Sequence, residues 1–350
     1  MAEADPTARL PAPVDALCLL LLIPVAAARW TFTPDFWWHL ALGHDAIAQG
    51  AVQSVERYSW TAPGTVYQAH SWATGVLFAA VDTLAGLSGL EVLAFAGVVA
   101  SARLVFALSR EWGSGPWAGA LASILFVSTS MRLLTLRPQL FTYALLAWLV
   151  LAWLRWRRGA DRMLLLAPLV AIPWANLHGA FVVAPALLAL VAGQSFFEGD
   201  RRRARTLLLL AIGCVLAGLV APGGPKYTLN ALFNTPLGSE FAVYVNEWRR
   251  PVFDKVPGFW LVLLGAPAVL AFGRVRPRVD EALLFCGGLF AALSAWRHVP
   301  LFGVIGLPIL AAWTSRAIRR LRGRPLHVAH APLRWGSPVL LALVLLGLLL

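Results

Sequence analysis

Hydrophobic positions in this chain form long runs, and short polar loops separate one run from the next. The runs are long enough for an α-helix to cross about 30 Å of hydrocarbon, and the loops are rich in Arg, Gly and Pro. This pattern predicts an all-α fold, a polytopic membrane helix bundle of about 11 spans. The predicted spans are residues 16–28, 90–108, 117–131, 140–154, 163–175, 181–197, 206–220, 259–272, 281–296, 301–313 and 338–350.

The stretch from residue 30 to residue 88 interrupts the pattern because its first part is too polar to cross a bilayer. Here Thr33 is a suitable helix cap, Pro34 suits the first helical position, and Asp35 falls in the first turn. Apolar residues then recur on one face, so residues 34–49 are predicted to form an amphipathic helix on the membrane surface. The predicted apolar face comprises Phe36, Trp37, Leu40, Ala41, Ile47 and Ala48.

The charge of the loops predicts the topology. Arginine is concentrated in four loops, at 155–162, 200–205, 274–278 and 316–324, and the positive-inside rule places them in the cytoplasm. Span parity then places the loops at 176–179, 221–257 and 297–300 outside. Residues 30–88 also lie outside if residues 72–87, which are short and carry Asp82, form an interfacial or re-entrant helix. We therefore predict a single integral membrane domain, residues 1–350, in a bacterial inner membrane, with periplasmic loops at 30–88 and 221–257.

Composition supports a membrane protein and excludes a soluble globular one. Hydrophobic residues make up 59% of the chain, charged residues only 13%, and the mean hydropathy is +0.71. The net charge of +12 comes almost entirely from arginine in short loops, which indicates topology and contact with anionic lipids rather than nucleic acid. The three cysteines each lie inside an apolar run, so we interpret them as packing residues.

The predicted outer face carries the candidate chemistry. Asp35 could accept a proton from an acceptor hydroxyl, although a carboxylate in a first turn can also simply complement the helix dipole. Four basic residues could bind a phosphate, or could anchor to lipid headgroups instead: Arg137, Lys226, Arg297 and His298. Arg137 is the strongest of them because Pro138 fixes the start of the following helix.

A second group of residues could line a substrate pocket. It consists of Trp37, Trp38, His39, Trp60, His70, His178 and Glu247. Flat aromatic faces, here those of Trp37, Trp38, Trp60, Trp72 and Tyr67, can stack on sugar rings, but tryptophan and tyrosine also form belts at any bilayer interface. We expect no cofactor. A divalent metal bound by Asp35, His39 and His44 is an alternative, although these residues do not form a tight ligand motif.

The segment T-P-D-F-W-W-H at 33–39, with Y-S-W-T-A-P-G at 58–64, R-P-Q at 137–139 and N-L-H-G at 176–179, is similar to a group of uncharacterised bacterial multi-pass proteins. The architecture resembles the GT-C class of polyprenyl-phosphate-dependent glycosyltransferases, which includes protein O-mannosyltransferases and aminoarabinose transferases. The architectural likeness covers most of the chain, and the motifs cover only the first loop.

The resemblance implies a set of roles. Asp35 would be the catalytic base, and arginines near the outer ends of the spans would bind the donor phosphate. The chain also departs from the class, because many members carry a D-x-D/E pair where this chain has Thr33 before Asp35. It has no W-W-D-Y-G segment of the oligosaccharyltransferase kind, so metal-dependent N-glycosylation is not expected.

The resulting hypothesis is an inverting membrane glycosyltransferase. Its partners would be a polyprenyl-phosphate-linked sugar, membrane lipids, and an acceptor glycan, lipid or protein. The alternative is a non-enzymatic multi-pass membrane protein, either a lipid or polymer transporter or an assembly subunit, which predicts a continuous polar path through the bundle. The enzyme hypothesis predicts instead that Asp35 faces a cavity with Arg137 within reach.

Overall fold

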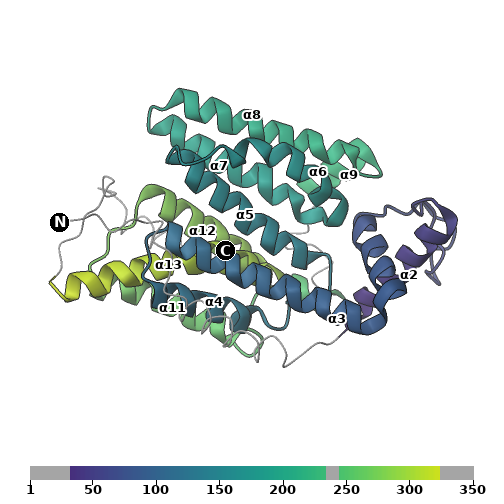
Figure 1. Ribbon diagram of the computed structural model, residues 1–350, viewed down its shortest axis with the longest axis horizontal. Coiled ribbons are helices and arrows are strands. Elements are labelled where there is room, and N and C mark those ends of the chain that lie inside the picture. The colour runs from purple at the N-terminus through teal and green to yellow at the C-terminus, as the bar shows by residue number, and fades with distance from the viewer. Residues whose placement is uncertain (1–31, 234–243, 324–350) are drawn as a thin grey trace. The chain divides into compact units, whose positions relative to one another are not determined.

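The computed structural model describes residues 32–233 and 244–323, so the predicted spans 16–28 and 338–350 lie outside the described residues. Within the described residues the fold is helical, and the only β-pairing is an isolated bridge between Val55 and Val66. The all-α prediction is therefore confirmed for this part of the chain (Figure 1).

Each predicted span within the described residues is helical, and α2, α9 and the first part of α3 are helical outside those spans. The helices are α2 (Pro34–Gln49), α3 (Trp72–Glu111), α4 (Pro116–Ser130), α5 (Gln139–Arg157), α6 (Ala167–Leu177), α7 (Val183–Phe197), α8 (Arg201–Ala217), α9 (Gly224–Phe233), α11 (Pro257–Phe272), α12 (Val279–Ser294) and α13 (Val299–Leu321). Short 3-10 turns are η1 (Met163–Leu166), η2 (Gly179–Val182), η3 (Gly218–Val220), η4 (Asn246–Trp248) and η5 (Trp296–His298). Helix α9 was not predicted, because the range 221–257 was interpreted as a loop.

Five helices are long and apolar enough to cross a membrane: Trp72–Glu111, Gln139–Arg157, Gly179–Phe197, Arg201–Val220 and Trp296–Leu321. Three shorter apolar helices cover Pro116–Ser130, Met163–Leu177 and Pro257–Phe272. These apolar helices support a membrane protein.

Helix α3 contains a break that bears on the prediction for residues 72–87. Gly86 has φ 61° and ψ −160°, so the helix stops there and restarts. The segment before the break is helical, as predicted. Whether it crosses the membrane stays a prediction.

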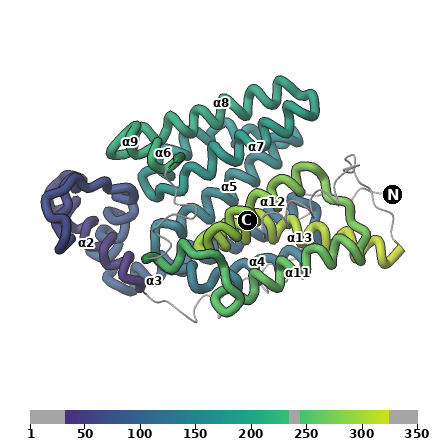
Figure 2. The backbone as a smooth tube through the Cα atoms, turned by 180° about the vertical axis from the view of Figure 1, so that it is seen from behind, coloured from purple at the N-terminus to yellow at the C-terminus, as the bar shows by residue number. Residues whose placement is uncertain are grey.

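The chain divides into two compact units. Among the described residues, the loop unit comprises 32–97 and 135–233, and the C-terminal unit comprises 98–134 and 244–323. In the loop unit, α8 packs against α6 and α7, and both views show these three helices side by side (Figures 1 and 2). The largest fully buried side chains of the loop unit include Trp153, Trp174 and Phe181.

The C-terminal unit packs α4, α11 and α12 around α13 (Figure 2). Its core includes the aromatic cluster of Phe259, Phe285, Phe302 and Trp313.

A buried charge network lies at the start of α12. The side chain of Glu281 is 1% exposed, and it accepts hydrogen bonds from Arg316 Nη2 at 2.6 Å and Trp313 Nε1 at 3.0 Å. Arg278 forms two hydrogen bonds with the buried Asp280. Glu281 lies on α12, whereas Arg316 and Trp313 lie on α13, so these hydrogen bonds join the two helices. The guanidinium groups of Arg316 and Arg278 also neutralise the two buried carboxylates.

Candidate functional site

Helix α2 carries the predicted catalytic residue, and glycines hold this helix against the start of α3. A Cβ atom on Gly43 would lie 1.9 Å from the Gly75 carbonyl oxygen, and one on Gly75 would lie 2.7 Å from the His39 carbonyl oxygen. The two backbones therefore touch. Phe36 and Leu40 are buried at this crossing.

The predicted boundaries of α2 are confirmed, but the predicted cap is confirmed only in position. Thr33 occupies the N-cap position, yet its side chain makes no capping hydrogen bond. Ile47 is 51% exposed, because Gly43 and not Ile47 meets α3, and contact of the apolar face with a membrane stays a prediction.

Asp35 and Arg137 form an ion pair within the loop unit. Arg137 Nη2 donates to Asp35 Oδ2, although 102 residues separate the two in sequence. The arginine side chain is only 10% exposed, whereas the carboxylate side chain is 54% exposed. Arg137 therefore contacts Asp35 directly, where the sequence hypothesis expected it across a cavity. The carboxylate of the pair is therefore accessible from outside, and the guanidinium group is mostly covered by the protein.

His39 lies one helical turn after Asp35. Burial lowers the pKa of His39 to about 4, the charges of His70 and Arg137 lower it further, and the charge of Asp35 opposes them. The ring is therefore neutral at pH 7. Within the described residues, neither of its ring nitrogens makes a hydrogen bond, so it can accept one from a ligand.

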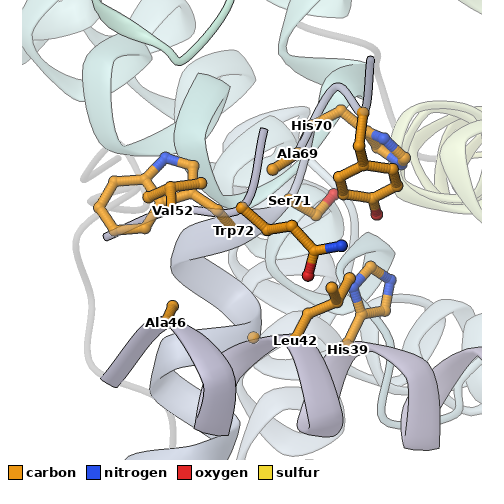
Figure 3. Close-up of a pocket in the computed structure, with 11 residues that line it drawn as sticks. His39, Leu42, Ala46, Val52, Ala69, His70, Ser71 and Trp72 are labelled. Atoms are coloured by element: carbon orange, nitrogen blue, oxygen red, sulfur yellow. The ribbon is translucent and has the colours of Figure 1, made fainter. Parts of the chain in front are cut away.

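A small cavity adjoins His39. Figure 3 shows His39, Leu42 and Ala46 on α2 below it, and Ala69, His70, Ser71 and Trp72 above it. Val52, Gln53, Tyr67 and Gly75 complete the lining. Its volume of about 20 Å³ is enough for a water molecule and too small for a whole sugar ring.

Two polar residues of this lining, Ser71 and Gln53, were missed by the sequence analysis. Ser71 Oγ and Gln53 Oε1 are buried and have no hydrogen-bond partner among the described residues. Trp72 Nε1 donates to Asn176 Oδ1 at 2.7 Å, which fixes the indole. Ser71 precedes the first residue of α3, and that position in sequence was the one available signal.

Of the predicted tryptophans, Trp72 lines the cavity, whereas Trp37, Trp38 and Trp60 do not. Trp38 Nε1 donates to the Tyr67 hydroxyl at 3.3 Å, so Trp38 supports a lining residue from behind. Trp37 is 48% exposed and Trp60 is 97% exposed. Both are placed as expected for residues at an interface, so their predicted role in substrate binding stays a prediction.

Two further predicted residues lie elsewhere in the loop unit. His178 Nδ1 is 2.8 Å from the Thr142 hydroxyl, which also accepts a hydrogen bond from Trp174 Nε1 at 2.9 Å. This arrangement fixes the His178 ring. Lys226 is exposed on α9, and its neighbour Tyr227 donates to the carbonyl oxygens of His70 and Ala175.

The remaining predicted residues form a cluster of their own in the C-terminal unit. The Arg297 guanidinium lies 4.2 Å from the centre of the Trp248 ring, and the His298 ring meets Trp248 edge-on at 5.8 Å. Glu247 lies beside Trp248 in η4. Whether this cluster acts together with Asp35 stays a prediction.

Two of the three proposed metal ligands, Asp35 and His44, are engaged in other contacts. His44 Nε2 lies 3.0 Å from Asp82 Oδ2, and Asp35 is paired with Arg137. In the described part of the chain, no three His, Cys, Asp or Glu side chains gather in a way that could hold a metal ion.

Comparisons with protein-family models, with curated proteins and with solved structures find no match to this chain. The site is therefore interpreted from its own geometry.

Proposed function

We propose that this protein is an integral membrane glycosyltransferase that moves a sugar from a polyprenyl-phosphate donor to an acceptor hydroxyl. In this proposal the chain has a GT-C-like architecture of about 11 spans. Residues 30–88 face the periplasm of a bacterial inner membrane. The observation that carries the proposal is the Asp35–Arg137 pair, which combines a base and a phosphate-binding cation at one place.

The chemistry follows from these two side chains. The ionised carboxylate of Asp35 takes the proton of the acceptor hydroxyl, and the acceptor oxygen attacks the anomeric carbon. The bond between that carbon and the phosphate oxygen breaks, and the polyprenyl phosphate leaves with the electron pair. Attack from the side opposite the leaving group inverts the anomeric centre. Arg137 stabilises the negative charge on the departing phosphate.

The ion pair also gives the resting enzyme a defined geometry. A guanidinium group binds carboxylate and phosphate in the same manner, so a donor phosphate can compete with Asp35 for Arg137. Binding of the donor would then free the carboxylate beside the acceptor. Because the Asp35 side chain is half exposed, an acceptor can reach it.

The test compares Asp35→Asn with Asp45→Asn in purified protein supplied with a panel of polyprenyl-phosphate-linked sugars and membrane extracts as acceptors. Asp45 is a matched control because it lies on the same helix and, among the described residues, accepts a single surface hydrogen bond, from Tyr58. Release of polyprenyl phosphate should fall about 100-fold or more in Asp35→Asn, since asparagine cannot take the proton. Asp45→Asn should keep the wild-type rate.

Equal rates in the two variants would exclude Asp35 as the base. If no donor is consumed even by the wild-type protein, the transporter or assembly-subunit alternative is favoured instead.

A further inference from the structure

The cavity beside His39 contains more unsatisfied polar groups than a packed interior normally tolerates. Ser71 is 4% exposed, and its Oγ has no partner among the described residues. Gln53 Oε1 is likewise buried without one. Burying such groups without hydrogen bonds costs about 1–3 kcal/mol each, so a ligand or a water molecule should satisfy them.

The position of Ser71 strengthens this argument. A serine just before a helix usually caps it, by accepting a hydrogen bond from a backbone N–H of the first turn. Here the Ser71 hydroxyl accepts no such bond among the described residues, and the N–H of Thr74 donates to the Ser71 backbone carbonyl. The hydroxyl lines the cavity rather than capping α3 (Figure 3).

The chemistry of the lining indicates what the cavity binds. Its walls combine two aromatic rings, Trp72 and Tyr67, with two imidazoles, an amide and a hydroxyl. Mixed aromatic and neutral polar walls suit a carbohydrate, which presents apolar faces and neutral hydroxyl groups. His39 fits this interpretation because its neutral ring can accept a hydrogen bond from a hydroxyl.

We propose that this cavity binds one hydroxyl or hydroxymethyl group of a sugar, with Ser71 donating to its oxygen and either Gln53 or His39 accepting its one proton. The volume of about 20 Å³ holds a group of that size, so the rest of the sugar lies outside. One turn of α2, about 5.4 Å, separates His39 from Asp35. A sugar anchored here presents its other hydroxyls towards Asp35. The role of this sugar as the acceptor rests on the proposed function. The binding of the sugar to the cavity does not depend on that function.

The test measures sugar binding without any reaction. Saturation-transfer NMR is recorded on the full chain in phosphatidylcholine nanodiscs with glucose, mannose, galactose or arabinose. At least one of these sugars should receive saturation from the wild-type protein. Ala46→Leu fills the cavity from α2 and should abolish the signal. Ala48→Leu makes the same change at an exposed position of the same helix and should not.

A second pair of variants separates binding from folding. Ser71→Ala removes a hydroxyl that makes no hydrogen bond in the described residues, so it should weaken binding about 2- to 12-fold without lowering thermal stability. Thr74→Val removes a hydroxyl that donates to the Leu177 carbonyl. It should lower stability and leave the sugar affinity unchanged.

Two outcomes would overturn the inference. Absence of a signal with every sugar would mean that the cavity holds only water, and an undiminished signal in Ala46→Leu would place the sugar elsewhere. Asp35→Asn distinguishes this inference from the proposed function. If Asp35→Asn retains sugar transfer while Ala46→Leu loses sugar binding, sugar binding in the cavity is supported and the catalytic role of Asp35 is excluded.

Discussion

Substitution of Gly43 provides a quantitative test of whether its contact with Gly75 positions α2 against α3. A Cβ atom at position 43 would meet the Gly75 oxygen at 1.9 Å, its carbonyl carbon at 2.3 Å and the Val76 nitrogen at 2.9 Å. All three atoms belong to the backbone, so no side-chain rotation can relieve the overlap. Gly43→Ala should therefore push α2 away from α3.

The size of the effect follows from the geometry. Ordinary contact begins at 3.4 Å, so the helices must separate by 3.4 − 1.9 = 1.5 Å along this direction. Overpacking of this kind costs about 1–3 kcal/mol, and the rigid backbone places this site at the upper end. Alanine also favours the helix over glycine by about 1 kcal/mol, which offsets part of the cost. We expect a net destabilisation of the α2 contact of about 2 kcal/mol.

Hydrogen exchange measures this destabilisation locally. Two kcal/mol corresponds to about a 30-fold change in an opening equilibrium, so the amides of α2 should exchange about 30-fold faster in Gly43→Ala. The matched control is Gly193→Ala in α7. A Cβ atom there has no neighbour within 4 Å, so α7 should exchange no faster than in the wild type.

Unchanged exchange of α2 in Gly43→Ala would refute the reasoning, since it would mean that the helices do not touch at Gly43. Faster exchange in every helix would instead indicate general destabilisation, and the positioning role of the glycine contact would again fail.

Two further predictions concern charge. Burial lowers the folded-state pKa of His39 from 6.5 to about 4, so stability should fall as the pH drops below 6.5 towards 4, by up to about 1.4 kcal/mol per pH unit. His39→Gln should reduce this loss in unfolding scans, and an equal loss in both proteins would contradict the assignment. In the C-terminal unit, Glu281→Gln leaves the partly buried Arg316 and Arg278 without full compensation and should cost about 3–5 kcal/mol in thermal unfolding. Asp161→Asn, at a loop acid, should cost little, and equal midpoints would show that the network does not stabilise the unit.

Much of the helical architecture could be predicted because its signals are local. Apolar runs determine where the helices lie, and Pro34 marks the start of α2 at the predicted residue. Helix α9 was missed because Gly224 and Pro225 at its start are typical of a turn. The break at Gly86 lies close to the predicted boundary between the helix at 72–87 and the span that begins at residue 90, although the sequence did not reveal which residue has the non-helical backbone angles.

The candidate site was only partly predictable, since its contacts join residues that are distant in sequence. Asp35 and Arg137 were each singled out by local signals, but their direct contact depends on how α2 packs near the start of α5. Ser71 shows the limit most clearly. A serine before a helix is expected to cap it, and only the packed structure reveals that the Ser71 hydroxyl makes no capping bond among the described residues. The hydroxyl is then left with an unmet hydrogen bond inside a cavity. Unmet hydrogen bonds of this kind depend on tertiary packing, so a search for binding sites in such chains should begin from them.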